Sequence, residues 1–252
     1  MDFSWVTNEL YLGYLWTGFV NTLILVTVSG TLGFALAVGV ALAQIVGPSW
    51  LSRLSRGFTT VIRGTPLLVQ LFFFYDGVGR LLPEIPGVRE SVLWPVLRDA
   101  FFYGALAFMI SVGAYAGEVL RGAMNSVPAG ELEAARAFGI SRAKVLWRIW
   151  LPRAVQICLP TLTGEIILLL KSVPLVSTIA VMDLLQAANI IRDETFLVYE
   201  PLLLIAGIYL ALVLVLTLVM RRVELEFPGV RPAAQGRRGW LRLIAGMGPR
   251  RL

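Results

Sequence analysis

The chain has 252 residues, of which 57% are hydrophobic and only 15% are charged. A soluble domain carries about a quarter charged residues, so this composition indicates an integral membrane protein and leaves no soluble domain of useful size. His is absent and Cys158 is the single cysteine, which argues against catalytic residues, a metal site or a disulfide framework on this chain. The net charge of +6 is also typical of nucleic-acid binders. In a membrane protein, however, basic residues chiefly mark cytoplasmic loops, and we expect no nucleic-acid partner.

Five apolar segments follow one another along the chain, and four of them have the length to cross a hydrocarbon core of about 30 Å as a helix. The second is the weakest, because residues 65–75 are bounded by Arg63 and Asp76. It crosses the membrane only if its helix covers about 57–79, and is otherwise a re-entrant segment. The sequence therefore predicts an all-α integral membrane protein with five transmembrane helices, preceded by an extracytoplasmic segment 1–17, at residues 18–44, 57–79, 100–120, 155–178 and 199–220.

The basic residues predict the orientation of these spans. Most of the 22 Lys and Arg lie at Arg53 and Arg56, between residues 121 and 153, or in the tail 221–252. The positive-inside rule places these regions in the cytoplasm and the acidic N-terminal segment outside, which requires an odd number of spans. We therefore expect an outside N-terminus and a basic cytoplasmic tail. That tail is either disordered or forms an interfacial helix at 240–244 held against anionic lipid.

A charged insert, ELEAARAFGISRAKVLWRIWLPRA, occupies residues 131–154 between apolar runs. Leu132, Ala135 and Phe138 recur at a spacing of three and predict one apolar helix face. Gly139 is expected to end that helix, and a second helix over 142–151 is expected to end at Pro152. The residues alone leave two interpretations open, namely a passive amphipathic loop on the bilayer and a docking helix for a soluble cytoplasmic partner. A helix–turn–helix DNA reader is disfavoured, because it needs a compact third helix and access to a groove.

Several blocks of the sequence carry a resemblance to a known family. Glu133-Ala134-Ala135, followed by Gly139 and by residues 149–152, resembles the EAA coupling loop of ABC importer permeases. Three further blocks resemble the polar-amino-acid permeases, and the resemblance spans about 18–220. They are RGTPLLVQLFFFY from Arg63, AYAGEVLRGAMNSVPAG from Ala114 and LPTLTGEIILLLKSVPLVSTI from Leu159. The chain departs from the family pattern at Gly164 and in the Ser-Val-Pro that follows Lys171, which puts the exact substrate in doubt.

The resemblance implies the architecture of a type I ABC importer permease in the bacterial inner membrane. Its partners would be a second permease chain, a dimer of cytoplasmic ATPases and an extracytoplasmic amino-acid-binding protein. The chain itself has no GxxxxGK[ST] phosphate loop, so ATP and Mg are expected on the ATPase and no cofactor on this chain. The resemblance places the coupling loop at 128–152 and its contact residues at Glu133, Ala134, Ala135, Gly139 and Pro152.

Two charged residues, Glu165 and Lys171, lie within the fourth span. A charge at membrane depth costs at least about 2.5–3.5 kcal/mol, so it is expected to face a cavity or a partner. Six positions correspond to about 240° around a helix, which places the two on different faces. A free amino acid is a zwitterion, so its path needs an acceptor for the ammonium and a donor for the carboxylate. We predict Glu165 as the acceptor, with donors and neutral groups drawn from Lys171, Arg63, Ser172, Thr163 and Thr65. A purely structural hydrogen bond for Glu165 and a snorkelling Lys171 are the alternatives.

Three further features of the spans indicate helix packing and not chemistry. Glu118 and Arg121 are three residues apart, and we interpret them as a structural pair. Gly113 and Gly117 form a GxxxG pattern, which favours close approach of a second helix. Gly64 and Pro66 predict a kink or gate beside the second span.

These features favour a permease subunit that imports polar or charged amino acids by alternating access and is not itself an enzyme. An ion-coupled secondary transporter of a small zwitterionic solute, with Glu165 as the carrier, is the alternative. A membrane protein whose insert docks a signalling partner is a third possibility.

Overall fold

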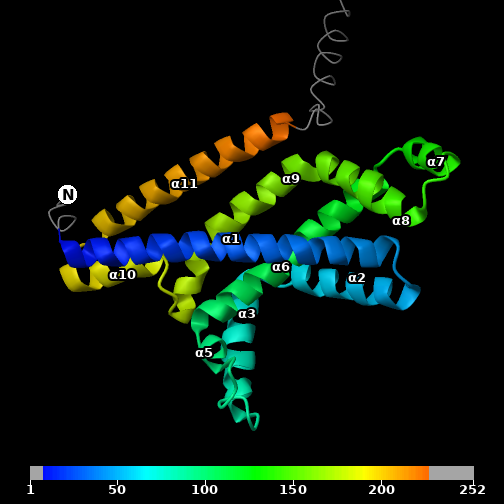
Figure 1. Ribbon diagram of the computed structural model, residues 1–252. Helices are drawn as coiled ribbons and strands as arrows, with labels where there is room; N and C mark the ends of the chain where they lie inside the picture. The colour runs from blue at the N-terminus through cyan, green and yellow to red at the C-terminus, as the bar shows by residue number, and fades with distance from the viewer. Residues whose placement is uncertain (1–7, 227–252) are drawn as a thin grey trace, which may run out of the picture.

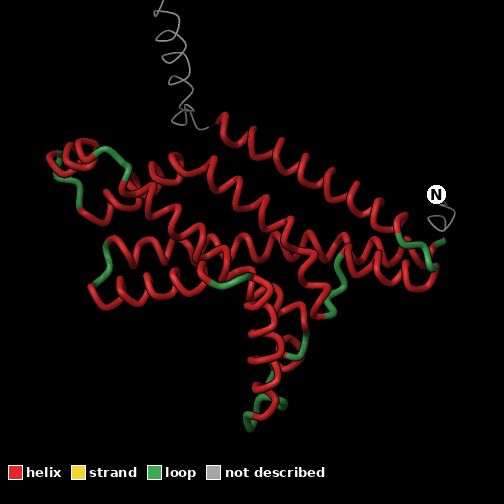
Figure 2. Tube along the Cα trace, turned by 180° about the vertical axis from the view of Figure 1, so that it is seen from behind, coloured by secondary structure: helices red, strands yellow, loops and turns green. Residues whose placement is uncertain are grey.

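A computed structural model of the chain describes residues 8–226, and all regular structure in that part is helical (Figures 1 and 2). Four helical stretches are long and apolar enough to cross a membrane, and a bent pair of shorter helices brings the number of candidate spans to as many as five. The elements are α1 (Glu9–Ile45), α2 (Ser49–Gly64), α3 (Leu67–Phe72), the π-turn η2 (Phe73–Val78), α4 (Gly79–Leu81), the 3₁₀ turn η3 (Leu82–Glu84), α5 (Trp94–Leu97), α6 (Ala100–Asn125), α7 (Ala129–Ala137), α8 (Arg142–Val145), the π-turn η4 (Leu146–Trp150), α9 (Leu151–Ser172), the 3₁₀ turn η5 (Val173–Ile179), α10 (Leu184–Thr195) and α11 (Tyr199–Glu226).

The long helix α1 organises the bundle. Helix α2 folds back beside its second half, α10 lies beside its first half, and α6 and α9 cross it (Figure 1). The segment from α3 to α5 projects away from α1 at a steep angle. The short helices α7 and α8 lie together at the end where α1 meets α2, far from the N-terminus of α1 (Figure 1).

Helix α1 begins nine residues earlier than the expected first span. Its first residue is Glu9, and the side chain of Asn8 caps it by accepting a hydrogen bond from the Leu10 N–H at 3.0 Å. Residues 9–17 are therefore helical and continue directly into the first span. The expected basic tail begins inside α11, which runs to Glu226. The remainder of that tail, including the proposed interfacial helix at 240–244, lies outside the described residues.

The second candidate span is broken, so the expectation of one helix over 57–79 was wrong. Helix α2 ends at Gly64, a new helix begins at Leu67, and the two are bent by 109°. Pro66 has no N–H for the helix ladder and holds Thr65 in extended backbone, with φ −110° and ψ 141°. The Gln70 side chain stabilises the break by donating to the Ile62 carbonyl at 2.8 Å and the Thr65 carbonyl at 3.1 Å. The kink predicted from Gly64 and Pro66 is confirmed.

The helix expected to end at Pro152 instead passes through it. One helical run extends from Arg142 to Ile179 and includes Pro152 near the start of α9. The turn before it is a π-turn, in which the Leu151 N–H bonds to the Leu146 carbonyl. A π-turn is wider than an α-turn, which makes room for the proline ring and keeps the helix continuous. The residues of the insert are thereby joined rigidly to the fourth span.

Close packing of α1 on α6 depends on the predicted glycine pattern. A Cβ placed on Gly117 would lie 2.7 Å from Val40 Cγ1, and one on Gly113 would lie 2.5 Å from Leu36 Cδ2. Both distances are shorter than carbon atoms tolerate, so glycine allows the helices to approach this closely. The GxxxG prediction is confirmed as a packing feature.

Candidate substrate path and coupling surface

Helix α9 places Glu165 beside two adjoining cavities of about 260 and 270 Å³. The larger is formed by α3, α6 and α9. Its polar lining consists of Ser111, Tyr115, Glu165 and Ser172. The smaller is almost entirely apolar, and both cavities share Val112, Glu165 and Leu169. Glu165 is the one charged residue among the residues that line these two cavities.

Within residues 8–226 the Glu165 carboxylate has no hydrogen-bond or ion-pair partner. Burying a charge without a partner is costly, and the nearest compensating charge is the Arg63 guanidinium, which interacts with Glu165 electrostatically. The carboxylate is therefore free to accept hydrogen bonds from a cation that enters the cavity. The structural alternative for Glu165, a hydrogen bond between helices, is absent from the described part of the chain.

Arg63 lies at the end of α2 and packs over the ring of Tyr115, with 5.4 Å between Cζ and the ring centroid. The Tyr115 hydroxyl also donates to the Arg63 carbonyl oxygen at 3.3 Å. Tyr115 therefore connects Arg63 to the Glu165 cavity, which its ring helps to line. Tyr115 could not be predicted as part of the site, because an aromatic residue in an apolar span carries no signal of its own.

The other predicted path residues divide into two groups. Ser172 lines the Glu165 cavity, although its hydroxyl donates to the Leu168 carbonyl at 2.9 Å. Lys171 is exposed and lines neither cavity, so it is not the partner of Glu165. Lys171 and Ser172 are adjacent in the sequence, and adjacent residues of a helix point in different directions, so Ser172 faces the cavity and Lys171 does not.

Thr163 and Thr65 make contacts between and within helices and lie outside these cavities. The Thr163 hydroxyl is 2.7 Å from Glu224 Oε1 and so ties α9 to α11. The Thr65 hydroxyl donates to the Val61 carbonyl at 3.0 Å and accepts from Gln70 Nε2 at 3.0 Å, inside the α2–α3 bend. Their expected contribution to the Glu165 cavity was wrong, because local backbone geometry and a neighbouring helix already occupy both hydroxyls.

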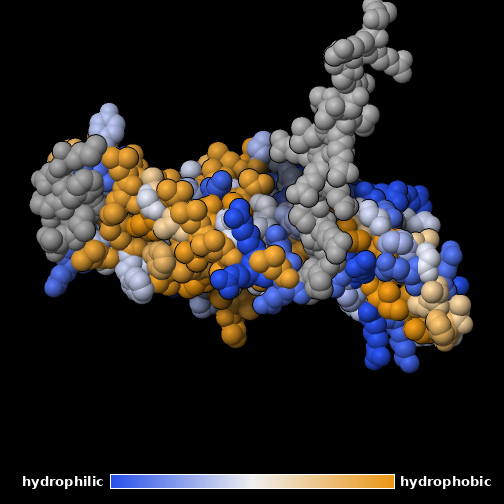
Figure 3. Space-filling view, turned by 90° about the horizontal axis from the view of Figure 1, so that it is seen from above, coloured by the Kyte–Doolittle hydropathy of each residue, from blue (hydrophilic) through white to orange (hydrophobic). Residues whose placement is uncertain are grey.

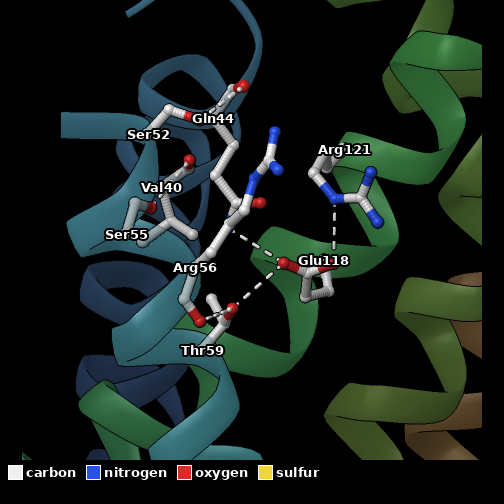
Figure 4. Close-up of polar contacts among 8 residues, drawn as sticks. All are labelled: Val40, Gln44, Ser52, Ser55, Arg56, Thr59, Glu118 and Arg121. Atoms are coloured by element: carbon white, nitrogen blue, oxygen red, sulfur yellow. Dashed lines mark hydrogen bonds and ion pairs between the residues drawn. The ribbon is translucent and has the colours of Figure 1, made fainter. Parts of the chain in front are cut away.

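Glu118 joins three helices near the end of the bundle that carries α7 (Figure 4). Its Oε1 accepts from Gln44 Nε2 of α1 at 2.9 Å and from Thr59 Oγ1 of α2 at 3.1 Å. Its Oε2 pairs with Arg121 Nε one turn along α6 at 2.9 Å. The ion pair expected between Glu118 and Arg121 is therefore present, and Glu118 also accepts hydrogen bonds from α1 and α2.

This network borders a third cavity of about 560 Å³ between α1, α2 and α6. Its lining is mostly polar and includes three arginines and one carboxylate. The lining residues are Gln44, Arg56, Thr59, Thr60, Arg63, Gly64, Glu118 and Arg121. None of the described residues forms a cluster of three or more His, Cys, Asp or Glu that could hold a metal ion.

Helix α7 presents part of the predicted coupling residues outward. Glu133 and Ala134 are exposed, and Gly139 follows the helix in left-handed backbone with φ +73°. Ala135 is buried, so it cannot form the outer surface that was expected of it, and Leu132 is the residue of α7 that packs against the core of the bundle. Phe138 is 87% exposed and does not continue the buried face, because the helix ends at Ala137 and the chain turns there.

Two contacts join this region to the bundle. Arg153 Nε of α9 lies 3.5 Å from Glu131 Oε2 of α7, and Trp150 Nε1 donates to the Met124 carbonyl at the end of α6 at 2.8 Å. Displacement of α7 therefore acts directly on α9, and the Trp150 bond ties the start of the same helical run to α6. Pro152 is part of α9 itself and not of a loop.

Comparison with known proteins identifies the family of this chain. The family model of the inner membrane component of binding-protein-dependent transport systems matches residues 31–226. The chain belongs to this family. It is the permease subunit of an ABC importer, an integral, multi-pass protein of the inner membrane and not an enzyme.

Individual relatives of this permease agree with the family assignment. It is 38% identical over 206 residues to the octopine transport system permease protein OccM of Rhizobium radiobacter, covering 79% of this chain and 82% of OccM. It is 38% identical over 223 residues to the histidine/lysine/arginine/ornithine transport system permease protein HisM of Salmonella typhimurium, covering 84% of this chain and 89% of HisM. The fold resembles a chain of a crystal structure of an amino acid ABC transporter with histidines, with a TM-score of 0.74, 30% identity and coverage of 90% of this chain and 100% of that chain.

Proposed function

We propose that this permease moves polar or charged amino acids into the cytoplasm by alternating access, driven by ATP hydrolysis on a separate subunit. The observation that carries the proposal is the unpaired Glu165 carboxylate in a cavity whose other polar groups are hydroxyls. The names of the similar proteins support the substrate class, since they specify octopine, histidine, lysine, arginine and ornithine.

The chemistry of the Glu165 cavity suits a zwitterion. Glu165 offers acceptors to an ammonium group, and Arg63, beside Tyr115 at the cavity wall, offers donors to a carboxylate. The apolar cavity on the other side of Glu165 can accept an aliphatic side chain. A cavity of this size binds small ligands by combining a few placed polar groups with apolar walls.

The proposed orientation has the N-terminus outside and α7 in the cytoplasm. It rests on the distribution of basic residues and on the hydrophilic surface that gathers at the end of the molecule with α7 and α8 (Figure 3). In this orientation α7 meets the ATPase dimer. A second permease chain and an extracytoplasmic amino-acid-binding protein complete the assembly, with ATP and Mg bound by the ATPases.

Transmission of the ATPase movement would use the rigid connection described above. Glu133, Ala134, Phe138 and Gly139 form the outward side of α7 and its end, whereas Leu132 packs against the core of the bundle. The Glu131–Arg153 pair attaches α7 to α9, and α8, η4 and α9 form one helical run, so a displacement of α7 would reach Glu165 through α9. Opening and closing of the Glu165 cavity would then accompany each ATP cycle.

The test uses the complete complex of permease, ATPase and binding protein in proteoliposomes. Glu165→Gln removes the charge and retains the shape, and we expect it to abolish uptake of labelled arginine while basal ATP hydrolysis continues. Lys171→Gln is the matched control, because Lys171 is on the same helix and lines neither cavity. Unchanged uptake by Glu165→Gln would overturn the role of Glu165. Uptake by the purified permease alone, driven by an ion gradient, would identify a secondary transporter instead.

A further inference from the structure

The third cavity, bordered by Glu118, lies on the opposite side of Arg63 and Tyr115 from the Glu165 cavity. Tyr115 lines the Glu165 cavity, Arg63 lines the Glu118 cavity, and the two side chains are packed against each other. The Tyr115 hydroxyl bonds to the Arg63 backbone as well. This pair therefore forms the wall between two polar cavities that follow one another along α6.

The Glu118 cavity has unused acceptors. An ionised carboxylate has about four acceptor positions, and Glu118 uses three of them, for Gln44, Thr59 and Arg121. Gln44 is only 7% exposed, and its Oε1 is buried without a hydrogen-bond partner in the described part of the chain. A buried, unpaired amide oxygen is costly, and a ligand ammonium would satisfy it.

The same cavity has an unused donor. Within residues 8–226 the Arg56 guanidinium has no hydrogen-bond or ion-pair partner, although it lies on the cavity wall across from Glu118 (Figure 4). A guanidinium is the preferred side chain for two-point binding of a carboxylate. The cavity thus repeats the combination of carboxylate and arginine found around Glu165, at about twice the volume, 560 against 270 Å³.

We propose that the Glu118 cavity is a second, inner binding site for the transported amino acid, separated from the Glu165 site by the Arg63–Tyr115 pair. The proposal rests on the function proposed above. The substrate carboxylate binds Arg56, and its ammonium binds Glu118 and Gln44 Oε1. Arg63 lines the Glu118 site and interacts electrostatically with Glu165 across Tyr115, so its guanidinium can attract the substrate carboxylate as the molecule passes from one site to the next.

The Arg63–Tyr115 pair lies at the α2–α3 bend, a position suited to a moving part of the protein. Arg63 is the residue before Gly64, where α2 ends and the 109° bend begins. A change in the bend would shift the Arg63 backbone, to which Tyr115 is bonded, and would open or close the passage between the two cavities. The Glu118 network, in contrast, joins three helices and stays in place.

The decisive experiment is equilibrium binding of radiolabelled L-arginine to the purified, nucleotide-free complex of permease and ATPase. We expect two sites per permease chain. Arg56→Gln should weaken one of them about tenfold or more and leave the other unchanged, whereas Glu165→Gln should remove the other. Within residues 8–226 the Arg56 guanidinium has no partner to lose, so the variant should fold normally. Arg53→Gln is the matched control on the same helix, because Arg53 lies outside the cavity and bonds to the Ser49 carbonyl.

The outcomes separate the two proposals. One site per chain that Glu165→Gln removes and Arg56→Gln leaves unaffected would overturn the inner site and leave the proposed function intact. Absence of arginine binding in the wild-type complex, together with absent uptake of arginine and other polar amino acids, would overturn the proposed function and the inner site with it. Equal weakening by Arg53→Gln and Arg56→Gln would also overturn the inner site, because it would show a general effect of charge.

The Arg63–Tyr115 wall has its own readout. Tyr115→Leu retains an apolar side chain and removes the cation–π contact and the hydroxyl. We expect labelled arginine to dissociate from the Glu165 site faster in this variant, in a background of Arg56→Gln that isolates that site. An unchanged dissociation rate would show that the pair does not separate the two sites.

Discussion

Arg153 Nε on α9 lies 3.5 Å from Glu131 Oε2 on α7, so a charge pair connects the short helix α7 to the helix that carries Glu165. Both side chains are more than a third exposed, at 37% and 38%. Exposed ion pairs contribute only about 0–1 kcal/mol to stability. The pair is therefore better suited to fix the position of α7 than to hold the fold together.

Charge reversal tests this connection. We expect Glu131→Arg to lower the number of amino acids imported per ATP hydrolysed severalfold in proteoliposomes, with little change in the thermal unfolding temperature. The double variant Glu131→Arg with Arg153→Glu restores an ion pair of opposite polarity and should recover most of the coupling. A double variant no better than the single one would show that Glu131 acts through another contact.

Substitution of Gly139 tests the end of the coupling helix. Its φ of +73° is unfavourable for a residue with a Cβ by about 1–2 kcal/mol, so Gly139→Ala should shift the chain after α7 and weaken ATPase binding. Gly130→Ala is the control, since Gly130 also lies in α7, has open space around it and needs no left-handed backbone. Equal ATPase affinity for the two variants would contradict a specific requirement at Gly139.

The exposed ring of Phe138 is a candidate anchor for the ATPase. At interfaces a buried aromatic anchor contributes about 2 kcal/mol or more, so Phe138→Ala should weaken ATPase binding by roughly 30-fold or more. Phe196 is equally exposed, at 87%, and follows α10 at the other end of the bundle. Phe196→Ala should leave ATPase affinity unchanged in a pull-down titration. Similar losses for both variants would indicate a nonspecific effect of removing an exposed ring.

Gly18 tests the packing of α1 on the start of α10. A Cβ at this position would lie 2.6 Å from the Asp183 carbonyl oxygen, and backbone cannot move aside cheaply. Gly18→Ala should therefore destabilise the protein by about 1–3 kcal/mol, seen as a lower unfolding temperature in detergent. Gly13→Ala lies on the same helix in open space and should be neutral or stabilising by up to about 1 kcal/mol. Equal unfolding temperatures would contradict the close contact.

Gln70 tests the bend between α2 and α3. Gln70→Leu removes the donor for the Ile62 and Thr65 carbonyls, and an unsatisfied buried group costs about 1–3 kcal/mol. We expect the bend to become less well defined, as a broader distance distribution between spin labels at the exposed positions Trp50 and Leu81. A distribution as narrow as that of the wild type would show that Pro66 alone sets the bend.

Each feature that could be predicted depends on its own local stretch of sequence. The spans followed from the length of apolar runs, and the kink beside the second span followed from Gly64 and Pro66. The end of the coupling helix followed from Gly139, whose left-handed backbone is a local property. The prediction that Pro152 ends a helix failed because a π-turn ahead of it, which no residue type announces, accommodates the ring.

The members of the two polar cavities could be predicted only in part. Glu165 and Arg63 were found because a charge in an apolar run is conspicuous. Arg56 was counted only as a marker of the cytoplasmic side, and Tyr115 was not distinguished from other aromatic residues. Thr163 was assigned to the path, although its hydroxyl faces Glu224 of another helix.

The sequence by itself determined that this protein is an all-helical membrane permease with a charged insert between its third and fourth spans and a kink at Gly64 and Pro66. Those properties follow from apolar length, from proline and glycine backbone preferences and from charge placement, all of which act along one segment. Only the tertiary structure decided that Arg63 packs on Tyr115 between two cavities and that Glu131 meets Arg153. Such contacts depend on how each helix is rotated and where it crosses its neighbours, and the packing of the whole bundle sets both.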